Sequence, residues 1–272
     1  MIRVEQHGPV RFIRLARPFL GRGLYWTGCY LVDGLLVDCG PPVTAPELSA
    51  ALSHERVEAL ALTHHHEDHT GGAAHLAASR GLLPLIHPRG RVLLQQGFEQ
   101  QPYRRLAWGR RPRLEAGELG PELRTRELRF EVLETPGHSP DHVCLFERER
   151  GFVLTGDLFL AERLRYLRSD EDLVALQASL ELVAGLGARQ VFCAHRGLVA
   201  DGSAALGRKA AHLRELREAI LEGLRRGEGE AALARRLVGP EGFLTYFSLG
   251  HFSARNFVRA VAASARRAGG PG

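Results

Sequence analysis

The chain has 272 residues, of which 44% are hydrophobic and 25% are charged. This composition is ordinary for a globular protein and excludes a disordered, collagen-like or membrane-spanning chain. There are 36 basic and 31 acidic residues, so the formal net charge is +5. Almost all of the basic residues are arginine, which favours anionic groups as binding partners, but a surplus of this size does not by itself indicate nucleic acid.

Three features predict a cytoplasmic protein that does not bind membranes. Charged residues recur between Met1 and Arg17, so no apolar run of signal-peptide length occurs there. No segment approaches the roughly 20 apolar residues of a membrane span. The cysteines stand in apolar, strand-like stretches without C-x-x-C spacing, which favours buried free thiols over disulfides. They are Cys29, Cys39, Cys144 and Cys193.

Strand patterns and tight turns dominate the first third of the chain. The apolar runs 29–32 and 35–38 flank Asp33-Gly34, which is a strong signal for a two-residue hairpin. Farther along, hydrophobic periodicity predicts four more elements. In chain order they are a helix over 45–53, a strand over 57–62, a helix over 73–79 and a strand over 82–86.

From 89 to 127 the pattern loosens, and regular elements return beyond it. The predicted strands cover 128–133, 143–146, 152–155 and 190–194. A helix is predicted over 173–186, with Gly187 as its C-terminal cap. Near residue 203 the character changes to amphipathic helices, predicted over 203–226, 231–237 and 253–267.

The densest group of chemically active side chains follows the predicted strand 57–62 directly. Residues 63–72 read T-H-H-H-E-D-H-T-G-G and contain the spacing H-x-H-x-D-H. This spacing would arise by chance in about one chain per thousand of this length. Imidazole nitrogens with a carboxylate match zinc's preference and also suit iron or manganese. The candidate ligands are His64, His66, Asp68 and His69.

Side chains alternate in an extended segment, so His64 and His66 should point the same way. By the same rule, His65 and Glu67 should point away from the ligands. One loop cannot close such a site, and three further candidates follow apolar runs that we expect to be strands. They are His138 in T-P-G-H-S, Asp157 in T-G-D and His195 in C-A-H-R-G.

This ordered set of motifs, preceded by V-D-C-G at 37–40, resembles the metallo-β-lactamase superfamily over residues 30 to about 200. Within it, the chain looks like the glyoxalase II-like hydrolases that carry a helical, winged-helix-like tail. The resemblance implies an α/β (α+β) fold, a four-layer αβ/βα sandwich with a small C-terminal helical appendage. It also implies a catalytic domain over 1–202 and a helical extension over 203–272.

The resemblance implies a site for two divalent transition-metal ions, zinc first, with iron or manganese as alternatives. His64, His66 and His138 would bind the first ion, and Asp68, His69 and His195 the second. Asp157 would bridge the two ions, and Asp68 would also steer the nucleophile or take up a proton. Asp38 would either hold the second nitrogen of a ligand histidine or shape a turn.

The activity that the resemblance implies is hydrolysis of an ester-like bond, in a thioester, lactone or similar small substrate, by water that a metal activates. Oxygen-reducing relatives in this superfamily usually have a carboxylate where this chain has His66, so the resemblance favours hydrolysis over oxygen reduction. Three alternatives stay open. They are an endoribonuclease or phosphodiesterase of the same fold, a mononuclear-iron persulfide oxidoreductase, and a non-catalytic metal-binding module.

Substrate contacts are expected in two places. The segment 103–113, Y-R-R-L-A-W-G-R-R-P-R, is either a lid that carries Tyr103 and Trp108 or a plain loop. Arg165 and Tyr166 follow Asp157, where thioesterase relatives contact their substrates. The mixed charges after residue 203 favour packing or oligomer contacts over nucleic acid, so we expect a small-molecule substrate and a monomer or homodimer.

Overall fold

The computed structural model describes residues 1–96 and 100–268. It divides into two compact units. The first comprises Met1–Glu134, Pro140–Leu160 and Ala188–Gly202. The second comprises Thr135–Ser139, Ala161–Gly187 and the described residues from Ser203 onward. The division into a catalytic domain over 1–202 and an extension over 203–272 stays a prediction.

The first unit contains two β-sheets. The larger sheet has seven strands in sequence order, antiparallel from β1 to β4 and parallel from β4 to β7. Its strands are β1 (Ile2–His7), β2 (Val10–Phe19), β3 (Arg22–Val32), β4 (Leu35–Val37), β5 (Ala59–Leu62), β6 (Leu85–Ile86) and β7 (Gly117–Glu118).

The other sheet has six strands in the order β14-β13-β11-β10-β9-β8. Only β11 and β13 are parallel in it. The strands are β8 (Glu122–Arg124), β9 (Arg129–Glu134), β10 (Val143–Glu147), β11 (Phe152–Leu154), β13 (Gln190–Cys193) and β14 (Gly197–Val199).

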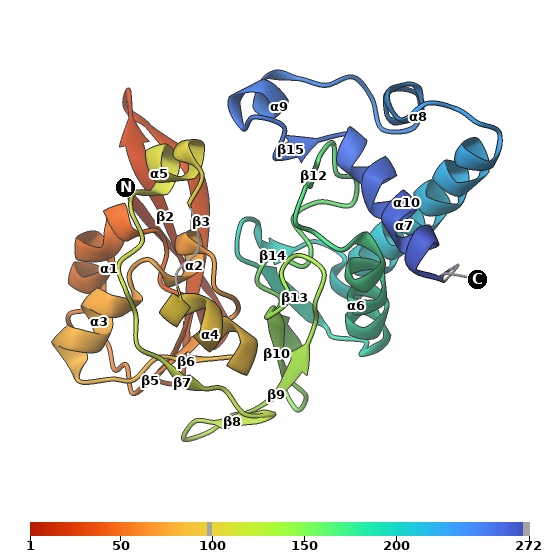
Figure 1. The fold of residues 1–272 in the computed structure, drawn as a ribbon. Coiled ribbons are helices and arrows are strands. Elements are labelled where there is room, and N and C mark those ends of the chain that lie inside the picture. Colours follow the sequence, from red (N-terminus) through yellow and green to blue (C-terminus); the bar gives the residue numbers. More distant parts are fainter. Residues whose placement is uncertain (97–99, 269–272) are drawn as a thin grey trace. The chain divides into compact units, whose positions relative to one another are not determined.

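The central strands of the larger sheet are apolar on both faces, because both faces are covered. On β5, Ala61 belongs to a core shared with the six-stranded sheet, where Phe12 and Tyr30 pack with Phe130, Phe152 and Phe192. Leu60 and Leu62 point the other way, into a second core under three helices. These helices lie along that face in Figure 1 and are α1 (Ala45–Ala51), α3 (Ala73–Arg80) and α4 (Pro88–Gln96).

The predicted hairpin is confirmed, since β3 and β4 pair across Asp33 and Gly34 with positive φ at both residues, 43° and 77°. The loosely patterned region 89–127 contains two helices that we did not expect, α4 and α5 (Pro102–Trp108). Pro102 suits the first turn of α5 because it lacks an N–H that would otherwise need a partner. The segment 103–113 therefore begins as a packed helix.

The second unit is mainly helical, as the sequence predicts. Its elements are β12 (Leu167–Arg168), α6 (Leu173–Gly185), α7 (Gly202–Arg225), α8 (Glu230–Leu237), α9 (Phe243–Phe247), β15 (Phe252–Ser253) and α10 (Arg255–Ala268). β12 pairs with β15, and α10 contacts α6 and α8. Gly187 follows α6 with a φ of 63°, in agreement with the predicted cap. None of the helices among the described residues has both the length and the apolarity to cross a membrane.

Candidate metal centre

Strand ends of the first unit bring most of the predicted ligands to one place. His64 and His66 follow β5, and the short helix α2 (Glu67–Thr70) then carries Asp68 and His69. Asp157 follows β11, and His195 follows its parallel neighbour β13. The candidate donors thus come from both sheets of this unit.

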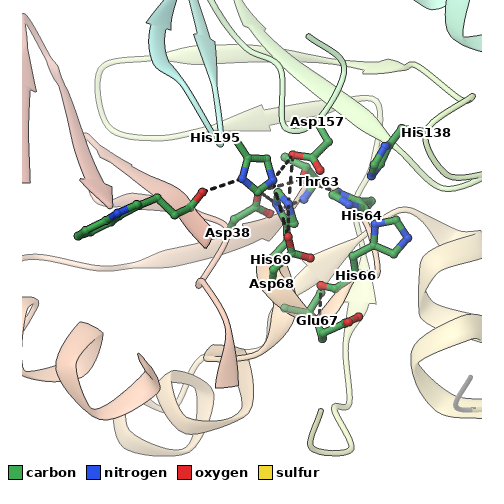
Figure 2. A network of polar contacts seen from close by, with 12 residues as sticks. Asp38, Thr63, His64, His66, Glu67, Asp68, His69, His138, Asp157 and His195 are labelled. Carbon is green, nitrogen blue, oxygen red and sulfur yellow. Dashed lines mark hydrogen bonds and ion pairs between the residues drawn. The ribbon is translucent and has the colours of Figure 1, made fainter. Parts of the chain in front are cut away.

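Four of these side chains converge, as Figure 2 shows. The donor atoms of Asp68, His69, Asp157 and His195 all lie within 4.8 Å of one another. The Nε2 atoms of His69 and His195 are each 3.2 Å from Asp157 Oδ1, and 3.8 and 3.7 Å from Asp68 Oδ2. Ligand atoms around a tetrahedral zinc with bonds of about 2.1 Å are about 3.4 Å apart. The spacing therefore fits a metal ion.

The tautomers of His69 and His195 also indicate a metal ion. His69 Nδ1 lies 2.7 Å from Asp38 Oδ2, and His195 Nδ1 lies 2.8 Å from the carbonyl oxygen of Trp26. Both partners only accept, so each Nδ1 carries a proton. When the ring is neutral, its Nε2 therefore turns a lone pair toward Asp157. A lone pair and a carboxylate oxygen repel each other unless a cation or a proton lies between them. The donor set therefore fits a divalent cation.

The electrostatics of the site favour positive charge. Burial by itself lowers the pKa of His69, but the carboxylates of Asp157, Asp38 and Asp68 outweigh it and raise this pKa well above its ordinary value. The pKa of His195 is also raised, because Asp157 and Asp68 outweigh the effect of burial. A metal ion would neutralise the same carboxylates.

Asp38 orients part of the site, which is one of the two roles that the sequence left open. Its buried carboxylate accepts the backbone N–H of Thr63 at 2.8 Å and the Thr63 hydroxyl at 2.8 Å, besides His69 Nδ1. His64 Nδ1 lies 3.0 Å from the same hydroxyl oxygen. Asp38 therefore holds His69 directly and His64 through Thr63 (Figure 2).

The other predicted ligand set is divided between the units. His64 and His66 are buried in the first unit, with ring centroids 4.4 Å apart. His138 belongs to the second unit, where its Nδ1 lies 2.7 Å from Glu171 Oε1 and Arg168 donates to its carbonyl oxygen at 3.0 Å. An acceptor on Nδ1 is typical of a metal-binding histidine. That His138 joins His64 and His66 on one ion stays a prediction.

His65 and Glu67 point away from the convergent donors, as the alternation predicts. His65 Nδ1 lies 2.7 Å from Asp141 Oδ1. Both oxygens of Glu67 accept hydrogen bonds from the guanidinium of Arg104 on α5, and both side chains are buried. The histidine-rich segment 63–72 therefore contacts α5 on the side that faces away from the convergent donors.

The candidate substrate contacts fall in different units. Tyr103 and Trp108 are buried on α5 of the first unit. Arg165 is exposed and Tyr166 half-buried in the second unit, with the Arg165 guanidinium 5.7 Å from the centre of the Tyr166 ring. Their contact with substrate stays a prediction.

Sequence reasoning missed two groups of residues that support the site. His142 lies one residue before β10, and its Nε2 accepts the backbone N–H of Asp157 at 3.2 Å. Tyr25 and Trp26 on β3 both contact His195. These residues stand far from their partners in the sequence and carry no motif, so no spacing signal could have identified them.

Comparisons with known proteins agree with this geometry. A family model described as the metallo-beta-lactamase superfamily matches residues 27–195. The chain belongs to this superfamily. The structure of a metallo-beta-lactamase family protein from Thermus thermophilus matches with a TM-score of 0.68 and 24% identity, over 97% of this chain and 95% of that one. The expected fold class is thereby confirmed.

Three curated relatives extend the comparison. Lactamase-like protein vrtG of Penicillium aethiopicum is 31% identical over 184 residues, 65% of this chain and 53% of that protein. Hydroxyacylglutathione hydrolase of Idiomarina loihiensis is 29% identical over 55% of this chain and 51% of that protein. Atrochrysone carboxyl ACP thioesterase of Aspergillus chevalieri is 28% identical over 66% and 54%. The chain spans about half the length of these relatives, and the expected glyoxalase II-like resemblance is confirmed.

Proposed function

We propose that this chain is a metal-dependent hydrolase that cleaves an ester-like bond, in a thioester, lactone or similar small substrate. The observation that carries the proposal is the convergence of two histidine Nε2 atoms on one oxygen of Asp157, each 3.2 Å away. Relatives named as a hydrolase and a thioesterase support the same class of reaction.

Two ions, for which zinc is our first choice, would occupy the site. Asp68, His69 and His195 would hold one ion and His64, His66 and His138 the other, with Asp157 shared between them. Such ions polarise the attacked group and make water a nucleophile near neutral pH. In the second unit, Glu171 would keep His138 oriented through the hydrogen bond to Nδ1.

The chain's own groups prepare the site before any substrate arrives. Asp38, Thr63 and the Trp26 carbonyl fix the planes and tautomers of His64, His69 and His195. His142 holds the backbone of Asp157. Asp68 is almost buried and keeps one oxygen within 3.8 Å of both Nε2 atoms, from which position it would steer the nucleophile or take up a proton. Groups fixed in this way need little reorganisation during reaction.

The test of the reaction class uses the protein reconstituted with zinc, iron or manganese and analysed for bound metal. We expect two equivalents of metal and turnover of a chromogenic thioester or lactone. Faster cleavage of a labelled RNA oligomer or of bis-p-nitrophenyl phosphate would assign the site to phosphodiester chemistry instead. Oxygen uptake with a persulfide would assign it to an oxidoreductase, and absence of bound metal would end the proposal.

Asp157→Ala tests the shared ligand. Because both Nε2 atoms face this carboxylate, we expect the variant to lose one equivalent of metal and most of its turnover. Glu115→Ala removes an exposed carboxylate of the same unit and serves as the control, with wild-type metal content expected. An Asp157→Ala protein with two equivalents and the wild-type rate would refute the bridging role.

A further inference from the structure

The β2–β3 hairpin contains an irregularity next to His195. Leu15 pairs with Thr27, but the next pair is Arg17 with Leu24, so Tyr25 and Trp26 together stand opposite Ala16 alone. Such a bulge re-aims the side chains and carbonyls of its strand. Tyr25 has a φ of 54°, in the left-handed region, which costs an L-residue about 1–2 kcal/mol. The hairpin therefore keeps a strained tyrosine at a position that suits glycine or asparagine.

Both residues of the bulge contact the same histidine. The Trp26 carbonyl accepts from His195 Nδ1 at 2.8 Å, and the Tyr25 ring meets the His195 ring edge-on, with centroids 5.6 Å apart and planes at 76°. A carbonyl oxygen accepts but cannot donate, so this contact selects the tautomer with the proton on Nδ1. Nε2 is then directed at Asp157 and Asp68.

The Tyr25 ring is itself supported from behind. It packs edge-on against Trp108 of α5, with centroids 5.5 Å apart, and the Arg104 guanidinium lies 5.4 Å from the Trp108 ring. Arg104 also pairs with Glu67 between two candidate ligands. Tyr25 is nevertheless 51% exposed, so filling the core does not explain why a large side chain is kept on a strained backbone.

We propose that Tyr25 is a positioning residue for His195. The bulge places the Trp26 carbonyl on Nδ1, and the Tyr25 ring, braced by Trp108, limits rotation of the imidazole. Together they set the affinity of the metal position formed by Asp68, His69 and His195. This inference rests on the metal site proposed above and concerns only how the chain orients one of its ligands.

Tyr25→Gly is the decisive variant, because glycine accepts the positive φ and removes the ring. We expect one of the two zinc equivalents to bind about 10-fold to 100-fold less tightly and the other to keep its affinity, as is typical when the support of one metal ligand is removed. Competition with a chromophoric chelator measures both affinities. Tyr25→Phe keeps the ring and should restore wild-type binding.

Leu20→Gly is the matched control. Leu20 lies in the same hairpin with a positive φ of 46° and a side chain that is 87% exposed, and we expect both affinities to stay at the wild-type values. An equal loss in Leu20→Gly would mean that general loosening of the hairpin is responsible. Wild-type affinity in Tyr25→Gly would overturn the proposal.

A second readout needs no metal. In nitrogen-15 spectra of metal-free protein, recorded at a pH above the raised pKa of His195 so that the ring is neutral, His195 should show one tautomer, protonated at Nδ1, with its signal assigned by its absence in His195→Gln. We expect Tyr25→Gly to show a mixture of tautomers. Wild-type spectra in Tyr25→Gly would refute positioning even if the protein binds metal. A shifted tautomer in a protein that binds no zinc would refute the metal site and leave the positioning supported.

Discussion

A single buried carboxylate, that of Asp38, fixes two histidines of the candidate metal centre. It accepts three hydrogen bonds, from the N–H and hydroxyl of Thr63 and from His69, and the hydroxyl of Thr63 also contacts His64. Asp38 adopts a φ of 63°, which non-glycine residues rarely do and which aspartate and asparagine tolerate best. The three hydrogen bonds therefore hold a backbone conformation that the residue alone would not favour.

Asp38→Asn keeps the size of the side chain and its tolerance of positive φ, but replaces one acceptor oxygen by an NH2 donor. Oδ1 accepts the Thr63 N–H, and Oδ2 accepts the Thr63 hydroxyl and His69 Nδ1. Whichever of these positions the NH2 group occupies, the hydrogen bonds accepted at that position are lost. We expect metal affinity to fall about 10-fold to 100-fold while the fold persists. Chelator competition and circular dichroism measure the two effects. Unchanged affinity in the folded variant would show that the Asp38 contacts do not orient the ligands.

At the same scale, alternation in the sequence correctly separated His64 and His66 from His65 and Glu67. This rule depends only on the local geometry of an extended chain. The partners of the outward residues could not be predicted in the same way. Asp141 is 76 positions from His65, and Arg104 is 37 positions from Glu67. Only folding brings these pairs together.

Helix α5 shows how one tertiary contact determines an element. Its arginine-rich sequence reads equally well as a lid or as a loop, yet Arg104 is buried and pairs with the buried carboxylate of Glu67. A buried charge without a partner is costly. The pair therefore requires α5 to stay against the segment that bears the candidate ligands.

Arg104→Met tests this anchor. The variant leaves Glu67 buried and unpaired, and we expect the free energy of unfolding to fall by about 3–5 kcal/mol. Adding Glu67→Leu removes the isolated charge and should recover most of the loss. Urea unfolding of the wild type, the two single variants and the double variant measures these free energies as a double-mutant cycle. Equal losses in the single and double variants would mean that the ion pair is not what secures α5.

The turn between β3 and β4 contains Asp33, whose contribution to stability should depend on pH. Burial alone would raise the pKa of Asp33, but hydrogen bonds from Thr125, the N–H of Glu127 and Arg56 lower it below its ordinary value. The stabilisation is therefore present above the unfolded pKa of about 4 and is lost as pH falls through the lower folded pKa.

Asp33→Asn keeps the positive φ and removes the charge. We expect it to be about 1 kcal/mol less stable than the wild type at pH 7, and the difference to shrink below about pH 4. Denaturant unfolding at several pH values measures this. A difference that stays constant from neutral pH to well below the unfolded pKa would show that ionisation of Asp33 does not contribute.

Across the whole first unit, the candidate ligands join the two sheets. His69 follows a strand of the seven-stranded sheet, whereas Asp157 and His195 follow strands of the six-stranded sheet. A metal bound by all three would therefore stabilise the packing of one sheet on the other. Because the ion binds only when both sheets are in place, its binding free energy adds to the free energy of unfolding.

Removal of metal should therefore lower the melting temperature. At a free metal concentration of about 100 times Kd the stabilisation is about 2.7 kcal/mol. At roughly 2–4 °C per kcal/mol for a chain of this size, we expect a loss of about 5–10 °C on chelation. Calorimetry with and without a chelator measures it, with Asp157→Ala showing a smaller shift. The same melting temperature in both conditions, for protein that demonstrably binds metal, would contradict this prediction.

The elements and the ligand motifs of this protein could be read from its sequence, because periodicity, turn residues and H-x-H-x-D-H spacing are local properties of the chain. That is why the hairpin at Asp33-Gly34 and the helices α7, α8 and α10 were predicted with little error, whereas the short helix α9 was not predicted. The tertiary structure decided which groups support the candidate ligands. It assigned Asp38, for which the sequence left two roles open, to His69, and it added Trp26 for His195 and Glu171 for His138. A hydrogen bond depends on distance and direction in space, and residues far apart along a chain leave no local pattern that records their meeting.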